Sequence, residues 1–304
     1  MRVKPELLLR TMKILGEISG IWPIFDSQVW IRIIKELVWF VSIVNITLII
    51  IPTMLSIHKE LHEGQPLKAL HSLSALPVYS ETFVNLLMWK YNKNQIQGLL
   101  WEMFDYIKSV NGRDKIILSK SINHHLPLYI FVVVFCSLAC VSHLCVPIFT
   151  PQRLLPSVAY YPFTIEPYTA TYYLVYTQQA IANLQCGLHH TVAPIIIAIL
   201  LSYVTAKLKV LLLRLKNVVN VDEFNDWIRQ HRDCIRYFEQ LDKTVRFIIF
   251  KSFVIITLSV ILGGIKIVHT SSVIETTKFL FIVIAGCLAV YLYIPPADDL
   301  YELD

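Results

Sequence analysis

The side chains best suited to chemistry in this sequence lie within long apolar stretches. His143 lies in residues 126–148, a stretch without Asp, Glu, Lys or Arg. Inside a membrane, such a histidine hydrogen-bonds either a ligand oxygen or a neighbouring helix, and the second is favoured. Another polar group consists of Asn183, Gln185, His189 and His190. No further metal ligands converge on it in the sequence, so hydrogen bonding between helices is the default interpretation.

Two acidic positions have simple interpretations as well. Glu81 lies in an otherwise apolar stretch, where it either pairs with a basic or hydroxyl group or is solvated near a membrane interface. Asp298 and Asp299 follow two prolines and are predicted to lie in a solvated loop. The sequence contains no nucleophile–base set, phosphate-binding loop or metal-ligand spacing. We therefore expect no enzyme activity, no cofactor and no metal.

The composition indicates a membrane protein. Apolar residues make up 55% of the 304 residues and charged residues 16%, whereas a soluble domain carries about 25% charged residues. Several stretches of about 20 residues have almost no charge, the length that a helix needs to cross the hydrocarbon core. The six cysteines match no zinc or disulfide pattern and are interpreted as small packing residues.

We predict a single transmembrane domain over residues 1–304, all-α, with six transmembrane helices. The predicted spans are 38–57, 69–89, 126–148, one within 168–206, 247–268 and 277–294. The second is the weakest, because Glu81 interrupts it. The loop 149–169 contains four prolines among aromatic residues, which predicts an ordered, non-helical outer loop.

The distribution of basic residues predicts the orientation. Of the 27 Lys and Arg residues, six lie in the amino-terminal segment 1–36, six in 90–125 and nine in 207–246. Positive residues accumulate in cytoplasmic connections. The amino terminus and both basic connections are therefore predicted to be cytoplasmic.

The fourth span is longer than one crossing requires, since residues 167–206 contain no charged side chain. Two crossings, broken at Gly187 or Pro194, are the rival interpretation. That arrangement would place the most basic connection outside, so one long helix that extends into the cytoplasm is favoured. Farther along, 221–246 has the spacing of an amphipathic helix. Its apolar face either packs on the chain's own helices or contacts another subunit through Trp227, Ile235, Phe238 and Leu241.

Several short motifs occur in a characteristic order. They are Trp22-Pro23, the basic segment 90–103, the outer run Tyr160-Tyr161-Pro162-Phe163 leading to Pro167-Tyr168, Tyr172-Tyr173-Leu174, the segment 228–243 (IRQHRDCIRYFEQLDK) and the segment 291–300 (YLYIPPADDL). In this order, and with the predicted topology, the chain resembles the insect odorant receptors, which have seven helices and inverted topology. Members of that family continue into a seventh span, whereas this chain stops at Asp304, so a truncated form is expected.

The resemblance implies a function. It implies an odorant-gated, non-selective cation channel subunit that acts in olfaction at the plasma membrane of sensory neurons. The implied partners are a volatile odorant, membrane lipid and a co-receptor in a hetero-tetramer, with no nucleic acid. A gustatory receptor of the same superfamily and a non-functional truncated fragment remain alternatives. The basic-residue bias speaks against a G-protein-coupled receptor, which would have an outside amino terminus.

An odorant site should be an apolar cavity with a few oriented polar groups. The predicted topology places such a cavity among the outer halves of the second, third, fourth and sixth spans. The candidate lining residues there are Val78, Tyr79, Val141, Ser142, His143, Val146, Tyr172, Tyr173, Tyr176, Gln179, Leu280, Phe281 and Ile284. For each of them, ordinary helix packing is the competing interpretation.

Overall fold

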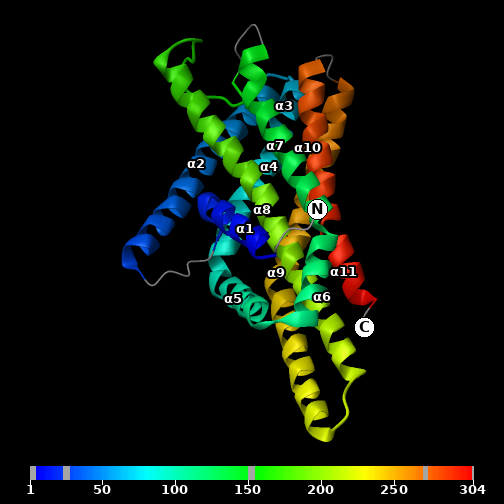
Figure 1. Ribbon diagram of the computed structural model, residues 1–304. Helices are drawn as coiled ribbons and strands as arrows, with labels where there is room; N and C mark the ends of the chain where they lie inside the picture. The colour runs from blue at the N-terminus through cyan, green and yellow to red at the C-terminus, as the bar shows by residue number, and fades with distance from the viewer. Residues whose placement is uncertain (1–4, 23–27, 150–154, 270–272, 303–304) are drawn as a thin grey trace.

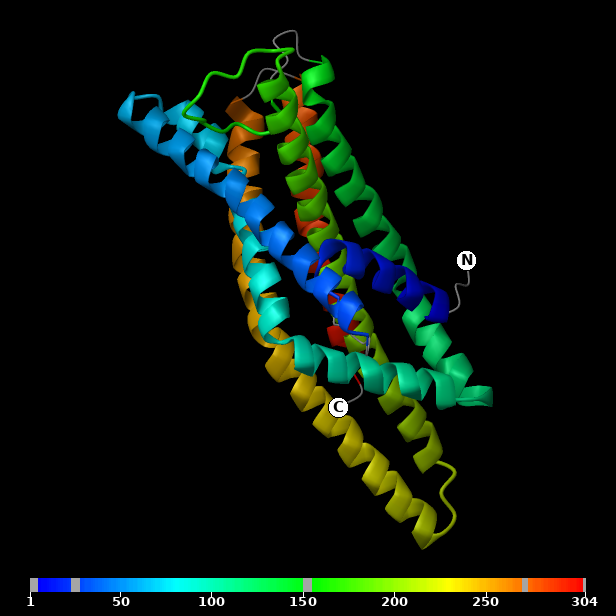
Figure 2. The same cartoon turned by 90° about the vertical axis from the view of Figure 1, so that its left-hand side faces the viewer.

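The computed structural model describes residues 5–22, 28–149, 155–269 and 273–302, and every regular element in these ranges is a helix. The helices are α1 (Pro5–Ser19), α2 (Val29–His62), α3 (Pro66–Leu73), α4 (Leu76–Tyr91), α5 (Lys93–Ser109), α6 (Gly112–His124), α7 (Leu126–Phe149), α8 (Ala170–Leu215), α9 (Val221–His269), α10 (Val273–Tyr291) and α11 (Ile294–Tyr301). They form an elongated bundle (Figures 1 and 2). The all-α prediction is confirmed.

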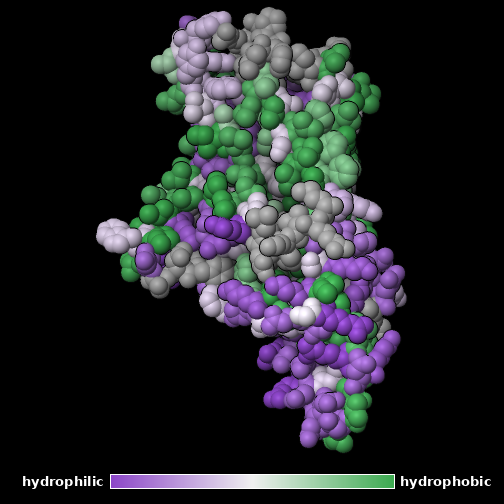
Figure 3. All heavy atoms as spheres, viewed as in Figure 1, coloured by the Kyte–Doolittle hydropathy of each residue, from purple (hydrophilic) through white to green (hydrophobic). Residues whose placement is uncertain are grey.

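Five helical stretches in the described residues are long and apolar enough to cross a membrane. They are Val29–His62, Gly112–Cys145, Ala170–Leu215, Val221–His269 and Thr276–Tyr301. Figure 3 shows mainly hydrophobic residues over the upper part of the molecule and mainly hydrophilic residues over the lower part. The chain is a multi-pass integral membrane protein.

The second predicted span differs from the structure. Residues 69–89 are divided between α3 and α4, with a break at residues 74–75. Pro77 stands in the first turn of α4, where its missing N–H costs nothing and its fixed φ suits a helix start. The apolar stretch is therefore two shorter helices rather than one long one.

The long fourth helix is confirmed, because α8 runs without interruption from Ala170 to Leu215 through both Gly187 and Pro194. It passes through the middle of the bundle and contacts α1, α2, α6, α7, α9 and α11 (Figure 1). Every residue of its 191–206 segment is buried. A helix that is apolar all round belongs in the interior, which explains the absence of charge in this stretch of sequence.

The ends of α8 and α9 form a stem below the bundle (Figure 1). The predicted amphipathic segment 221–246 is continuous with the fifth span, and together they make the single helix α9. Within the stem, the Trp227 indole donates to the carbonyl of Leu211 at 2.8 Å. Leu241 is fully buried, whereas Ile235 and Phe238 are 43% and 37% exposed.

The prediction of a loop at Asp298 and Asp299 was wrong, whereas Asp298 is exposed and Asp299 partly exposed, as expected of solvated residues. Both residues belong to the short helix α11, which packs against α8. The carboxylate of Asp299 lies 3.2 Å from Lys209 Nζ and 3.7 Å from His125 Nε2. These two basic partners, far apart in sequence, hold the helix against the bundle.

The connection before α8 is non-helical in residues 155–169, and residues 150–154 of the predicted loop lie outside the described ranges. The backbone N–H of Tyr160 donates to the carbonyl of Pro52 at 2.9 Å. Lys59 Nζ lies 4.3 Å from the centre of the Tyr160 ring. These contacts attach the loop to the upper end of α2.

Candidate functional site

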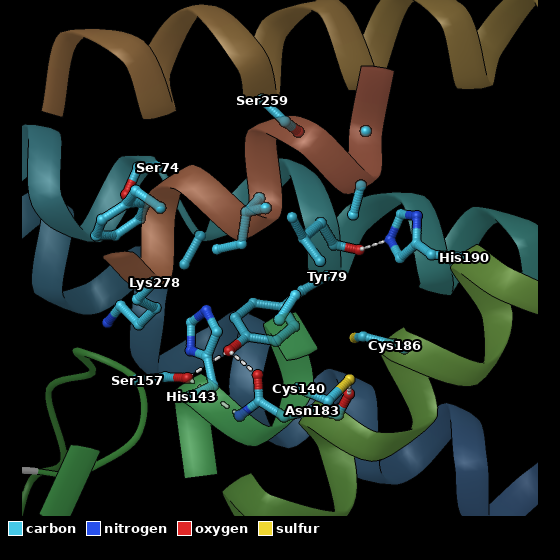
Figure 4. A pocket seen from close by; sticks show the side chains of 18 of the residues that line it. Ser74, Tyr79, Cys140, His143, Ser157, Asn183, Cys186, His190, Ser259 and Lys278 are labelled. Carbon is cyan, nitrogen blue, oxygen red and sulfur yellow. Dashed lines mark hydrogen bonds between the residues drawn. The ribbon is translucent and has the colours of Figure 1, made fainter. Parts of the chain in front are cut away.

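A cavity of about 100 Å³ lies beneath the loop 155–169, between α4, α7, α8, α9 and α10 (Figure 4). Small and aliphatic side chains make up much of its wall, including Ala139, Ile256, Ile282 and Ala285. A cavity of roughly 150 Å³ with apolar walls holds a benzene molecule. This cavity has a smaller volume of the same order, so its size and lining suit a compact organic molecule with few polar groups.

One wall carries a hydrogen-bonded cluster of three side chains. The Tyr79 hydroxyl, from α4, contacts the Ser157 hydroxyl and donates to Asn183 Oδ1 at 3.2 Å. Ser157 comes from the outer loop, and its backbone N–H donates to Gln179 Oε1 at 2.9 Å. Gln179 Nε2 in turn donates to the Tyr161 hydroxyl at 3.1 Å. The cluster thus joins the loop to α4 and α8 at the edge of the cavity.

His143 also faces the cavity, beside Tyr79 and Ser157 (Figure 4). Its Nδ1 is buried and accepts or donates no hydrogen bond within the described part of the chain. Its position in the cavity wall fits contact with a ligand, which is one of the two interpretations open from the sequence. A ligand site with apolar walls uses a small number of polar groups to orient the ligand.

The inner end of the cavity adjoins a buried ion pair. Lys251 Nζ, from α9, lies 3.5 Å from Glu81 Oε1 of α4 and also contacts Asn85 Oδ1. The cavity-lining His190 has its Nδ1 3.6 Å from Glu81 Oε2. Glu81 therefore pairs with a basic partner inside the protein rather than being solvated. Because the dielectric constant inside a membrane protein is low, removal of either residue would leave the other charge buried without a partner, which destabilises the protein.

The outer end of the cavity is basic. Lys266 Nζ lies 3.9 Å from the centre of the Phe279 ring, and Lys278 Nζ lies 5.0 Å from it. The His71 ring meets the same phenyl ring edge-on, with centroids 6.2 Å apart. All four side chains line the cavity. Cation–π contacts of this kind stabilise an ammonium group away from water.

A second hollow, of about 890 Å³, lies between α5 and α8 and is open to its surroundings. Lys207 there pairs with Glu102 at 3.2 Å, and its ammonium lies 5.4 Å from the centre of the Tyr106 ring. Burial raises the pKa of Tyr106. The lining of this second hollow is mainly polar and charged, unlike that of a site for apolar ligands. The cavity beneath the loop 155–169 is therefore the better candidate.

Three of the predicted lining residues, Val78, Tyr79 and His143, line the cavity. The other predicted residues with described side chains lie outside its wall. These are Val141, Ser142, Tyr172, Tyr173, Tyr176, Gln179, Leu280, Phe281 and Ile284. The side chain of the remaining one, Val146, lies outside the described part of the structure.

The residues outside the wall have other neighbours. Val141, Tyr173 and Leu280 are about half exposed on the outer surface of the bundle. The Ser142 hydroxyl donates to the Ala139 carbonyl, and the Tyr176 hydroxyl donates to Leu144 at 3.1 Å. Phe281 packs on Phe135 with ring centroids 6.4 Å apart, Tyr172 packs between Tyr173 and Tyr176, and Ile284 is partly buried.

The sequence prediction missed one face of α8. Asn183, Cys186, Gly187 and His190 recur at helical spacing and all line the cavity. Positions i, i+3, i+4 and i+7 share one side of a helix. The spacing is visible in the sequence, but the predicted lining residues of the fourth span all lie in its first turns.

Residues 65–302 match the family described as "7tm Odorant receptor". This is well over half of the chain. The chain belongs to the odorant receptor family. Most of the motifs behind the resemblance fall in the matched range, and Trp22-Pro23 lies before it.

Solved structures of the insect olfactory receptor OR5 from Machilis hrabei have the same fold as this odorant receptor. The chain matches one of them with a TM-score of 0.82 at 14% identity, covering 98% of this chain and 80% of that one. A second, of OR5 in complex with eugenol, matches with a TM-score of 0.81 at 14% identity, covering 98% of this chain and 81% of that one. No curated protein matches the chain.

Proposed function

We propose that this odorant receptor binds a small volatile molecule in the cavity beneath the loop 155–169 and acts with a co-receptor as an odorant-gated, non-selective cation channel. The observation that carries the proposal is the cavity itself, with apolar walls and a small set of polar side chains. A receptor with the same fold has been solved with eugenol. The odorant receptor match favours this activity over gustatory reception.

The arrangement of the chain supports the predicted orientation in the plasma membrane of a sensory neuron. Helices α5 and α6, from the basic connection 90–125, lie toward the same end as the stem formed by α8 and α9 (Figure 2). The loop 155–169 lies at the opposite end. Positive residues favour the cytoplasmic side, so the loop and the cavity beneath it would face outward.

We also propose that the stem contacts a co-receptor within a hetero-tetramer. Of the four predicted contact residues, Ile235 and Phe238 are exposed on α9, while Trp227 and Leu241 pack mainly within the chain. Exposed apolar side chains below the apolar band need a partner surface to leave water. Lipid would cover the exposed apolar residues higher up.

Co-expression with the co-receptor in oocytes tests the proposed function. Odorant-evoked currents should be lost or strongly reduced by Ala139→Trp, because Ala139 lines the cavity and the indole would fill it. Val141→Trp is the matched control, since Val141 lies on the same helix but is 55% exposed. Silence of the unaltered chain across a broad odorant panel, with surface expression confirmed, would contradict the proposal.

A further inference from the structure

His190 has a different acceptor beside each of its ring nitrogens. Its Nε2 lies 3.5 Å from the Val78 carbonyl oxygen, at the outer limit for a hydrogen bond, and its Nδ1 lies 3.6 Å from Glu81 Oε2, just beyond that limit. A neutral imidazole carries hydrogen on one nitrogen and has a lone pair on the other. It can therefore donate to only one of the two acceptors. Which nitrogen carries the hydrogen decides whether Nε2 can donate a hydrogen bond to a ligand or accept one from it.

The two acceptor oxygens differ in the hydrogen bonds that they already accept from other groups. The Val78 oxygen accepts a hydrogen bond from the Thr82 hydroxyl at 3.1 Å. In contrast, Glu81 Oε2 is buried and has no hydrogen-bond partner among the described residues. A hydrogen bond to a carboxylate is stronger than one to a neutral carbonyl. Both differences favour placing the hydrogen on Nδ1, toward Glu81.

Lys251 keeps this carboxylate a good acceptor. Its ammonium lies 3.5 Å from Oε1, the other oxygen of Glu81, and also contacts Asn85. In this ion pair, Oε2 remains available as a hydrogen-bond acceptor. The order of contacts is thus Lys251, Glu81 and His190, from α9 through α4 to the α8 side of the cavity.

We propose that Glu81 holds His190 as the Nδ1–H tautomer, so that Nε2 is a hydrogen-bond acceptor at the inner end of the cavity. Ligands with a hydroxyl donor, namely alcohols and phenols, then bind better than ethers of the same shape. This inference rests on the proposed function, because it assigns a ligand class to the same cavity. His190 is the specificity-determining residue, and Glu81 positions its hydrogen.

The neighbouring polar cluster contributes no spare donor. The Tyr79 hydroxyl donates its hydrogen to Asn183 Oδ1 at 3.2 Å, which leaves Ser157 to donate to Tyr79. The Asn183 amide donates to the Gln179 carbonyl at 2.9 Å and to Ser157 Oγ at 3.4 Å. The amines of Lys266 and Lys278 lie at the other end, around Phe279. The hydroxyl and amide hydrogens of Tyr79, Ser157 and Asn183 are thus all used within the protein (Figure 4).

The tautomer can be measured without any ligand or current. We would label the histidines of the purified full chain with ¹⁵N in detergent micelles and assign His190 by comparison with His190→Gln. The nitrogen shifts should report hydrogen on Nδ1 alone. The double variant Glu81→Leu/Lys251→Met removes both charges and should move the hydrogen to Nε2. Hydrogen on Nε2, or on both nitrogens, in the unaltered chain would overturn the proposal.

The ligand preference is tested in the oocyte assay with 1-butanol and its isomer methyl propyl ether, which have the same number of heavy atoms and differ in the hydroxyl donor. One hydrogen bond contributes enough for the alcohol to act at about tenfold lower concentration. His190→Leu should remove that difference and retain the response to the ether, whereas His62→Leu, at an exposed position, should change neither. Equal potency on the unaltered receptor would overturn the inference and leave channel function intact. If neither compound evokes a current, only the proposed function is contradicted, and the nitrogen shifts still decide the tautomer.

Discussion

Gly187 of α8 packs directly on the side chain of Cys140 of α7, so that a β-carbon at position 187 would overlap the cysteine sulfur. Cys140 Sγ also lies 3.6 Å from the carbonyl oxygen of Asn183, one turn earlier on α8. The close approach of the two helices therefore depends on a residue without a side chain, as in other small-residue contacts between membrane helices. Both residues line the cavity, so the same contact sets part of its shape.

Gly187→Ala should destabilise the receptor by about 1–3 kcal/mol, the usual cost of overpacking. Adding Cys140→Ala should recover most of this loss, because it removes the overlapping sulfur. Gly264→Ala is the control, since nothing lies within 4 Å of a β-carbon built there. Thermal unfolding of the purified chain in detergent measures all three. An equal loss from Gly187→Ala and Gly264→Ala would contradict this account.

The ion pair between Glu81 and Lys251 should behave as a unit. Lys251→Met leaves a buried carboxylate and Glu81→Leu leaves a buried ammonium, and each should cost roughly 3–5 kcal/mol. The double variant should be close to the unaltered chain, because neither charge is then left alone in the interior. The amount of folded receptor that remains after heating in detergent is measured for the unaltered chain, both single variants and the double variant. The comparison gives the interaction free energy between the two side chains. Additive losses would mean that the two charges act independently.

Asn45 belongs to the sequon Asn45-Ile46-Thr47, but it is engaged between helices. Its amide donates to Gln185 Oε1 at 2.8 Å, and Gln178 Nε2 donates to its backbone oxygen at 3.1 Å. We expect no glycan at Asn45, so treatment with a glycosidase should not change its gel mobility. Asn45→Leu should lower stability by about 0.6–2 kcal/mol, the range for hydrogen bonds between membrane helices. A mobility shift that Asn45→Gln abolishes would refute the prediction.

Long apolar segments without charge were predictable because one physical rule, the cost of charge in hydrocarbon, decides them. The third span and the uninterrupted α8 follow from it. The division at Ser74 did not, since a break inside an apolar stretch depends on tertiary packing that composition does not record. The continuity of α9 was also missed, because the change from an amphipathic to an apolar pattern near residue 247 resembles a boundary.

The cavity was less predictable than the helices, for a geometric reason. Its wall uses one face of each helix, and the rotation of a helix about its axis is set by its neighbours. Val78 and Tyr79 were predicted from their place in the outer half of the second span and do line the cavity, whereas Val141, only two residues before His143, lies on the opposite surface of α7. The pairing of Glu81 with Lys251 joins residues 170 positions apart, which no local pattern reveals.

The exposed apolar side chains on the stem lead to the last prediction. Ile235→Asp and Phe238→Asp should each weaken co-purification with the co-receptor, because an interface that buries the new carboxylate must leave it without a partner. Neither should unfold the chain, since both side chains are more than a third exposed. Arg236→Ala is the matched control, as the Arg236 side chain is 74% exposed and pairs only with Asp233 of its own helix among the described residues. Co-purification at the level of the control would place the subunit contact on another surface, and the apolar pair on α9 would then need a different partner.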